Sequence, residues 1–266
     1  TELALPVDIG VSVFPRDGDD PLELLRNAEM ALHQVKRRED QRLGFFDTAM
    51  SYAVSERMTL ERSLMAALRA GQFELFYQPQ VRLDDYALVG AEALLRWRHP
   101  ELGTIAPEKF IPVAEETGLI VPLGRWVMEQ ACRQLHDWRD TALARLRMGI
   151  NISGRQFREA DLADTVAQVI RDSGVDASLL DLELTESMLM ADGESTLGIL
   201  RLLADQGVTL SIDDFGTGYS SLAYLKRFPV DTVKIDRAFV RDLEQDEDGR
   251  AIAKAIISLA HSLSLK

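Results

Sequence analysis

Segments of strand-like alternation, separated by segments of helical periodicity, run through most of this chain of 266 residues. Successive side chains of a strand point to opposite faces, and residues 180–185 place leucines on one face and Asp181, Glu183 and Thr185 on the other. Strands are expected near residues 73–81, 88–96, 146–152, 180–185, 208–213 and 232–236. Helices are expected over residues 107–138 (as two helices), 155–173, 194–206 and 249–263. This alternation favours parallel strands with helices packed outside, so a (β/α) TIM-type barrel is the leading α/β architecture and a doubly wound open sheet is the alternative.

The second face of these strands is polar, and most of its polar groups lie late in their strands. They are Glu92, Arg96, Asn151, Glu183, Asp213 and Lys234. Parallel strands that are covered on both faces have near-continuous apolar sequences, and these strands do not. Their polar face instead fits the inner side of a barrel, where active sites lie at the carboxyl ends of the strands. An antiparallel sheet with one solvated face would give the same alternation, but the helices between the strands argue against it.

Carboxylates that gather in a barrel mouth repel one another and raise each other's pKa values, and hard divalent cations relieve that repulsion. Glu92, Asn151, Glu183, Asp213 and Asp214 form an oxygen-rich set without a usable His or Cys. Such a set suits Mg²⁺ or Mn²⁺ better than Zn²⁺. Two ions of this kind can hold a phosphodiester and activate water for in-line attack.

The charge balance of the chain restricts its partners. Lys and Arg number 30 and Asp and Glu number 43, which gives a formal net charge of −13 that disfavours binding of a nucleic acid polymer. The single cysteine, Cys132, excludes an intrachain disulfide and fits a reducing compartment. No run approaches the ~18 apolar residues of a membrane span and no signal peptide is visible. A cytoplasmic location is therefore expected, with any membrane attachment of a longer parent protein lying in regions outside this chain.

The N-terminal part reads as the end of a separate unit. Residues 7–14 predict a strand, a helix is expected from Pro21, and residues 44–46 predict a short final strand. These elements cannot bury a core alone, so something N-terminal to them is expected. The predicted domains are an α+β remnant over residues 1–47 and an α/β domain over residues 48–266.

The order of several motifs resembles one family. Glu92-Ala93-Leu94, followed by Leu95-Arg96-Trp97, is similar to the signature of the EAL-domain cyclic di-GMP phosphodiesterases. Blocks in the family's order are Tyr77-Gln78-Pro79, Asn151-Ile152-Ser153, Glu183-Leu184-Thr185-Glu186-Ser187, the run from Asp213 to Leu222, and Lys234-Ile235-Asp236. The resemblance covers roughly residues 50–266. Residues 1–47 resemble the C-terminal end of a GGDEF domain, although the GGDEF signature itself is absent.

The resemblance implies hydrolysis of cyclic di-GMP to linear pGpG with two Mg²⁺ or Mn²⁺ ions. The implied metal ligands are Glu92, Asn151, Glu183, Asp213 and, for the second ion, Asp214. The implied catalytic residues are Lys234, Asp214 and Glu186, where Lys234 orients the attacking water or a phosphate oxygen and Glu186 braces the loop after Asp213-Asp214. The implied substrate contacts are Gln78 near a guanine, Arg96 on a phosphate, and Leu94.

The sequence also departs from the family pattern. The family continues past the Lys234-Ile235-Asp236 block with a helix, a seventh strand that carries a catalytic glutamate, and an eighth strand, whereas this sequence ends with the helix, at Lys266. We therefore expect a barrel truncated after the sixth strand and its helix, a sixth strand with unpaired backbone groups along its edge, and an inactive 266-residue fragment of an active parent. The intact motifs favour a phosphodiesterase over the alternative, a module that binds cyclic di-GMP without cleaving it. The expected partners are cyclic di-GMP, sensory or GGDEF domains on the N-terminal side, and a second copy, since dimers are common in the family.

Overall fold

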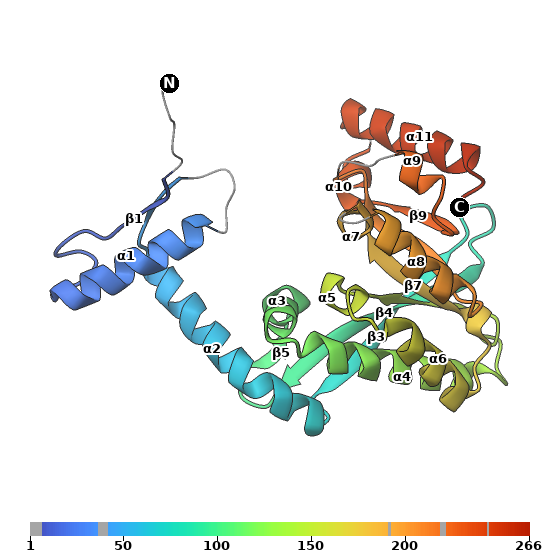
Figure 1. The fold of residues 1–266 in the computed structure, drawn as a ribbon, viewed down its shortest axis with the longest axis horizontal. Helices are drawn as coiled ribbons and strands as arrows, with labels where there is room; N and C mark the ends of the chain where they lie inside the picture. The colour runs from blue at the N-terminus through green and yellow to red at the C-terminus, as the bar shows by residue number, and fades with distance from the viewer. Residues whose placement is uncertain (1–6, 37–41, 191–192, 219–221, 244) are drawn as a thin grey trace. The chain divides into compact units, whose positions relative to one another are not determined.

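The computed structural model describes residues 7–36, 42–190, 193–218, 222–243 and 245–266. The chain forms two compact units, Thr1–Ala66 and Ala67–Lys266 (Figure 1). The division between them falls inside helix α2 (Thr48–Arg69). Each unit is described by itself.

In the first unit, a small parallel sheet packs against one helix. Strand β1 (Ile9–Val11) pairs with β2 (Leu43–Phe45), and α1 (Pro21–Lys36) contacts both strands. The helix approaches so closely that a Cβ atom at Gly10 would lie 2.1 Å from the carbonyl oxygen of Ala28. Glycine therefore permits this close packing of strand and helix, because any larger side chain would displace the helix.

The second unit contains a mixed sheet. Its strands are β3 (Phe73–Val81), β4 (Leu88–His99), β5 (Gly103–Ile105), β6 (Arg147–Asn151), β7 (Leu180–Thr185), β8 (Thr209–Phe215) and β9 (Thr232–Ile235). The order is β3-β4-β6-β7-β8-β9, with β5 paired to β4 outside this path. Strands β4, β6, β7, β8 and β9 are parallel to their neighbours in this order, whereas β3 and β5 are antiparallel to β4. The predicted strands and their parallel pairing are confirmed from β4 onward; within the described residues the sheet is mixed and no closed barrel is seen.

Helices fill the connections between the parallel strands. They are α3 (Pro107–Thr117), α4 (Ile120–Trp138), α5 (Gly154–Phe157), α6 (Leu162–Ser173), the 3₁₀ helix η1 (Ala177–Leu179), α7 (Glu186–Met190), α8 (Gly193–Ala204) and α9 (Leu222–Leu225). Two more helices, α10 (Arg237–Val240) and α11 (Glu247–Ser262), follow β9. The prediction of a single helix over residues 155–173 is wrong. Ser153 and Gln156 form a capping box that starts the short α5, and a separate helix then begins after Asp161.

The apolar face of the sheet forms one core with α4, α6 and α8. The sheet contributes Met148, Ile150, Leu182, Leu184, Leu210 and Ile212, all buried. The helices contribute Val127, Ala131, Val166 and Leu200, among others. Burial of each large aliphatic side chain stabilises the fold by about 1.5–3 kcal/mol. This core fixes the register of the central strands, and hence the positions of the polar side chains on their other face.

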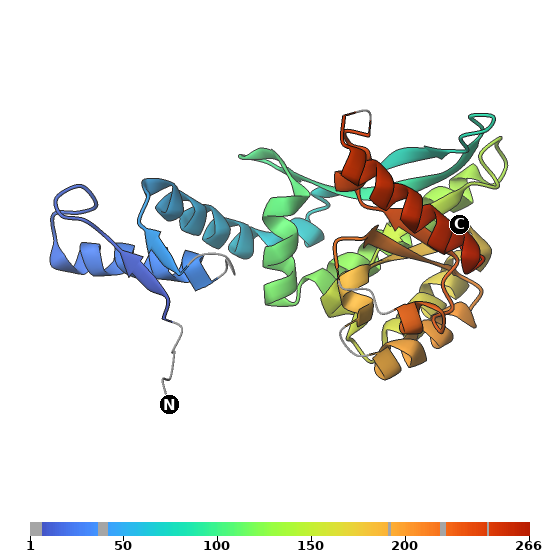
Figure 2. The same ribbon diagram turned by 90° about the horizontal axis from the view of Figure 1, so that it is seen from above.

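The outer edge of β9 is partly paired. The backbone nitrogen of Lys266 donates to the carbonyl oxygen of Asp231 at 3.0 Å, and the nitrogen of Val233 donates to the carbonyl oxygen of Lys266 at 2.9 Å. After α11, which packs against β9 and α10 (Figures 1 and 2), the chain thus returns to this edge. The expectation that the whole edge is unpaired is therefore wrong at Asp231 and Val233, because the last residues satisfy backbone groups there.

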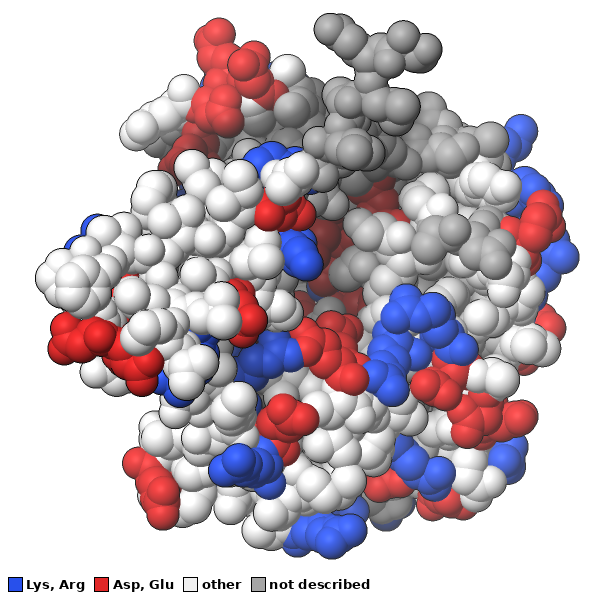
Figure 3. All heavy atoms as spheres, turned by 60° about the vertical axis from the view of Figure 1, so that its left-hand side comes forward, with Lys and Arg blue, Asp and Glu red and all other residues white. Residues whose placement is uncertain are grey.

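The surface in Figure 3 carries basic and acidic side chains interspersed among uncharged ones. The face shown there presents no continuous basic area among the residues described, as a polyanion-binding surface would require. Within those same residues, no helix combines the length and the apolar character that crossing a bilayer demands.

Two leucines on α8 give a test of the core. Leu200 is fully buried, whereas Leu202 is 58% exposed. We expect Leu200→Ala to lower the free energy of unfolding by about 2–5 kcal/mol, because it leaves a cavity, and Leu202→Ala to change it by less than about 1 kcal/mol. Urea denaturation followed by circular dichroism measures both values. Equal losses in the two variants would contradict the assigned packing of α8.

Candidate active site

Three carboxylates from three strands meet at the carboxyl ends of the parallel sheet. Glu92 on β4, Glu183 on β7 and Asp213 on β8 each offer an oxygen atom, and these atoms lie within 4.8 Å of one another. Asn151, the last residue of β6, donates from Nδ2 to Oε1 of Glu92 at 2.7 Å. Because parallel register aligns the strand ends, residues that are far apart in the sequence converge on one point.

Lys234 on β9 lies at the centre of this cluster. Its Nζ atom is 2.5 Å from Oε2 of Glu183, 3.1 Å from Oδ2 of Asp213 and 3.4 Å from Oε2 of Glu92. One ammonium group thus contacts three carboxylates, so the cluster keeps an excess of negative charge. A site with this excess attracts further cations.

Burial controls the ionisation of this cluster. It raises the pKa of Glu183 from an ordinary value of 4.5 to about 8, against the opposing effect of Lys234. Burial alone would lower the pKa of Lys234, but its contact with Glu183 and the charges of Asp213 and Glu92 outweigh this effect, and the pKa is raised. The lysine is therefore held as a cation, while Glu183 is the carboxylate that most needs a further positive charge.

One carboxylate oxygen of the cluster has no hydrogen-bond partner among the described residues. Oε1 of Glu183 is buried and accepts no hydrogen bond from any residue that the structure describes. A buried carboxylate oxygen without a partner is costly, and a bound cation would satisfy it. The donor set of carboxylate and amide oxygens has the chemistry that Mg²⁺ and Mn²⁺ prefer, so an ion of this type fits the residues present.

A bulge in β8 explains why two consecutive aspartates face the site. The register of β8 against β9 shifts between Ile212 and Phe215, and Asp214 adopts the left-handed conformation with φ of 54°. The extra residue turns the strand so that Asp214 lies next to Asp213 and near Asp236. Burial and the neighbouring carboxylates of Asp213 and Asp236 raise the pKa of Asp214.

Glu186 lies behind the site and contacts the backbone of the following loop. Its carboxylate is buried, and Oε2 accepts hydrogen bonds from the backbone nitrogens of Gly216 at 2.8 Å and Gly218 at 3.4 Å. A Cβ atom at Gly216, which has φ of 102°, would lie 2.9 Å from Phe239. The glycine therefore lets the loop after β8 adopt this tight path over Glu186. Residues 219–221 of the same motif lie outside the described residues.

The predicted substrate residues lie on β3 and β4. Gln78 is exposed and stands opposite Glu92 in the antiparallel ladder. Leu94 and Arg96 follow Glu92 on the same face of β4 because side chains alternate along a strand. The guanidinium carbon of Arg96 is 5.6 Å from the centre of the Phe76 ring, a cation–π contact that holds the arginine along the sheet.

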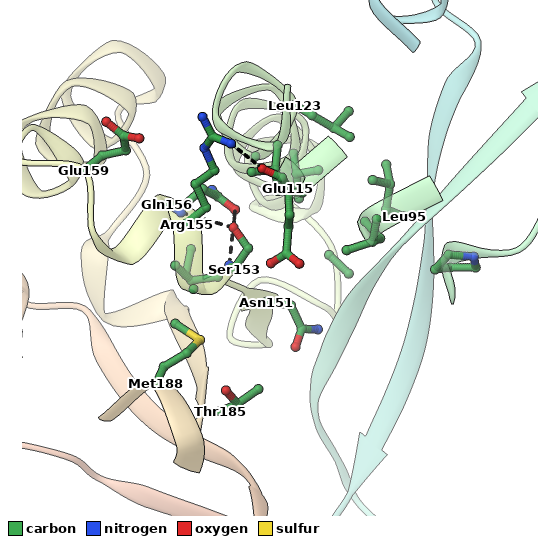
Figure 4. Close-up of a pocket in the computed structure, with 18 of the residues that line it drawn as sticks. Leu95, Glu115, Leu123, Asn151, Ser153, Arg155, Gln156, Glu159, Thr185 and Met188 are labelled. Atoms are coloured by element: carbon green, nitrogen blue, oxygen red, sulfur yellow. Dashed lines mark hydrogen bonds between the residues drawn. The ribbon is translucent and has the colours of Figure 1, made fainter. Parts of the chain in front are cut away.

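A pocket of about 970 Å³ opens beside Asn151 (Figure 4). Leu94 and Arg96 line it from β4 together with Ala93 and Leu95, and further lining comes from α3, α4, the end of β6, α5, the end of β7 and Met188 of α7. Leu94, Arg96 and Asn151 therefore connect the acidic cluster to a cavity large enough for a nucleotide base. The helical segments around this cavity carry no motif that sequence reasoning would assign to a site.

Sequence reasoning missed two groups near the cluster. It gave no role to Asp236, although two-residue periodicity places Asp236 on the same face as Lys234. It also gave none to Ser211, which is fully buried and donates to the carboxylate of Asp181 at 2.7 Å beneath the cluster. The predicted residues are found in and around the site. Lys234 contacts Glu92, Glu183 and Asp213, and Asn151 contacts Glu92. Asp214 adjoins this cluster, Leu94 and Arg96 line the pocket, Gln78 stands across from Glu92, and Glu186 lies behind.

The fold and the site define an α/β protein with an oxygen-rich candidate metal centre at the carboxyl ends of its parallel strands. The chain belongs to the EAL domain family, whose sequence model matches residues 61–266. The resemblance of residues 50–266 to this family is thereby confirmed, whereas the resemblance of residues 1–47 to a GGDEF domain stays a prediction.

Two curated relatives align over the chain's full length. The chain is 43% identical to the bifunctional diguanylate cyclase/cyclic di-GMP phosphodiesterase MucR of Pseudomonas aeruginosa over 265 residues, which covers 100% of this chain and 39% of MucR. It is 36% identical to the cyclic di-GMP phosphodiesterase PdeR of Escherichia coli over 265 residues, with 100% of this chain and 40% of PdeR covered. The chain thus spans about two fifths of the length of these relatives.

A solved structure is also similar. It is described as the PaMucR phosphodiesterase in complex with c-di-GMP, and the two chains superpose with a TM-score of 0.76 at 47% identity. The match covers 78% of this chain and 84% of the other. At this identity and coverage, the comparison supports both the fold and the family.

The pKa of Glu183 gives a test that requires no substrate. A carboxylate whose pKa is raised by folding contributes stability below its ordinary value of 4.5, and this contribution is lost as the pH rises through about 8. In the presence of a chelator, Glu183→Gln should therefore become more stable relative to the unmodified protein as the pH rises from about 5 to about 8. Urea denaturation at several pH values measures the difference.

Glu101→Gln, at an exposed position in the turn after β4, serves as the matched control for the change of charge. The burial assigned to Glu183 would be contradicted if the difference between Glu183→Gln and the unmodified protein stayed constant over this pH range.

Proposed function

We propose that this chain supplies the catalytic site of a cyclic di-GMP phosphodiesterase that yields linear pGpG. One observation carries the proposal: Glu92, Glu183 and Asp213 converge with Asn151 around Lys234 in a member of the EAL domain family. Two relatives that align with the whole chain are cyclic di-GMP phosphodiesterases by name. The activity and the substrate are carried from the names of those relatives to this chain as a proposal, and the roles of the site residues from the motifs of the family.

The charge of the substrate makes cations necessary for its hydrolysis. A cyclic dinucleotide carries a negative charge on each phosphate, and the acidic cluster would repel it. Glu92, Asn151, Glu183 and Asp213 would hold one Mg²⁺ or Mn²⁺ ion, and Asp214 would take part in holding a second. When bound, such ions neutralise phosphate charge and lower the pKa of water. The unpartnered Oε1 of Glu183 supports an ion at this position.

The chain's own side chains would then position the reacting groups. Lys234 has an ammonium group at the centre of the cluster and would orient the attacking water or a phosphate oxygen. Arg96 lines the adjoining pocket and would hold a phosphate through its guanidinium, with Leu94 against the substrate and Gln78 near a guanine. Glu186 would act through the loop after β8, which it anchors at Gly216, and not by touching substrate.

The proposal extends to the architecture. The parallel run from β4 to β9, with helices in its connections, supports a sheet of the (β/α) barrel type. Residues 1–47 would be the C-terminal end of a GGDEF-like domain, and residues 48–266 would belong to the EAL domain. The alignment with MucR over 100% of this chain, beyond the start of the EAL match at residue 61, supports such an N-terminal neighbour.

The test is product analysis. The protein is incubated with cyclic di-GMP and Mg²⁺ or Mn²⁺, and the nucleotides are separated by chromatography and identified by mass spectrometry. Appearance of linear pGpG supports the proposal. Binding of cyclic di-GMP without cleavage would instead indicate the alternative, a sensor module.

Glu92→Gln tests the metal centre. The substitution keeps the shape of the side chain but removes a charge that a bound ion requires, so we expect the rate of hydrolysis to fall about a hundredfold or more. Nucleotide chromatography measures the rate, and calorimetry with Mn²⁺ should show weaker metal binding. Unchanged turnover would remove Glu92 from the site.

Arg96→Ala separates substrate binding from metal binding. The loss of a charged, two-pronged hydrogen bond to a phosphate should weaken cyclic di-GMP binding about tenfold to a hundredfold and leave Mn²⁺ affinity nearly unchanged. Calorimetry measures both affinities. Arg98→Ala, which removes an exposed neighbour that pairs with Glu74, is the matched control. Unaltered nucleotide affinity in Arg96→Ala would contradict the role of this arginine.

A further inference from the structure

The pocket beside Asn151 contains a carboxylate that the proposed metal site does not use. Glu115, near the end of α3, lines the pocket, and its carboxylate points into it (Figure 4). Within the described part of the chain, this carboxylate has no hydrogen-bond or ion-pair partner. The group is half-buried, so it is available to a ligand that enters the cavity.

The position of Glu115 is fixed through its backbone. Nη1 of Arg155 on α5 donates to the carbonyl oxygens of Glu115 at 2.5 Å and Glu116 at 3.0 Å. Gly118, with φ of 81°, ends α3 in the left-handed conformation directly after them. The end of α3 is thus held by the short segment that follows Asn151, the last residue of β6.

The apolar part of the lining suits a flat aromatic ring, and it lies beside polar residues that include Glu116, Gln156 and Glu159. Ile111, Leu123, Val127, Ile152 and Met188 line the same cavity. Apolar walls with a few placed polar groups are the usual design of a base-binding pocket, in which the polar groups set the specificity. Glu115 supplies two acceptor oxygens and no donor, so it selects for a ligand edge that carries adjacent donors.

We propose that Glu115 is the residue that selects guanine in this pocket, an inference that rests on the proposed function and deepens it. The Watson–Crick edge of guanine presents two adjacent donors, the N1–H group and the exocyclic 2-amino group, which match the two oxygens of one carboxylate. Adenine presents an unprotonated N1 acceptor at the same place, which a carboxylate repels. A site built to accept hydrogen bonds from a ligand strongly rejects an analogue that lacks the donors.

The experiment measures base discrimination by calorimetry, with a chelator present so that metal-dependent turnover does not consume the ligand. The unmodified protein is titrated with cyclic di-GMP and with cyclic di-IMP, which lacks only the 2-amino groups. We expect cyclic di-GMP to bind about tenfold to a hundredfold more tightly, as the loss of a hydrogen bond to a charged group implies. In Glu115→Ala this ratio should fall to about twofold or less, mainly through weaker binding of cyclic di-GMP.

Glu115→Gln serves as the conservative variant: it keeps the shape of the side chain and one acceptor oxygen, so its ratio should fall between those two values. Glu108→Ala, an exposed position in the first turn of the same helix, is the control and should retain the full ratio. A ratio that is the same in the unmodified protein and in both Glu115 variants would overturn the inference while leaving the proposed function in place. So would equal binding of the two nucleotides by the unmodified protein. Failure of the unmodified protein both to bind and to hydrolyse cyclic di-GMP would overturn the proposed function and the inference together.

Discussion

The contact between Lys234 and three carboxylates is the interaction on which the site depends. Carboxylates whose oxygens lie within 4.8 Å of one another repel strongly where water is excluded, and one ammonium group offsets only part of that repulsion. Burial, reinforced by the charges of Glu92 and Asp213, raises the pKa of Glu183 despite the contact with Lys234, and its Oε1 atom is buried without a partner among the described residues. The protein thus maintains an arrangement that is costly by itself and that a divalent cation would relieve. Such an arrangement serves binding and chemistry better than stability.

The surrounding structure holds this arrangement in place. The apolar face of the same strands is buried under α4, α6 and α8, so the strands cannot shift to separate the charges. The bulge that brings Asp214 beside Asp213 places a residue in the left-handed conformation, and Glu186 anchors the loop that follows. Strain of this kind persists where neighbouring contacts over-determine the geometry, and it is concentrated at functional sites.

The acidic cluster and the pocket are parts of one continuous surface. Asn151 contacts Glu92 within the cluster and also lines the pocket, and the segment after it carries Arg155, which holds the end of α3. A ligand with phosphates and bases would therefore meet the proposed metal-binding cluster on one side and a cavity with apolar walls on the other. This arrangement fits the cyclic dinucleotide proposed as substrate.

The sequence by itself determined the alternating strands, their polar faces and the motif residues, because strand periodicity and local motifs are recorded within a few consecutive positions. It indicated Glu92, Asn151, Glu183, Asp213 and Lys234 together. Only the tertiary structure decided that Lys234 contacts Glu92 from 142 residues away, that β3 is antiparallel, and that Glu115 reaches the pocket from α3. These features depend on how distant segments pair and pack, and no local pattern encodes them: a half-buried glutamate in a helix reads the same whether it faces solvent or a cavity.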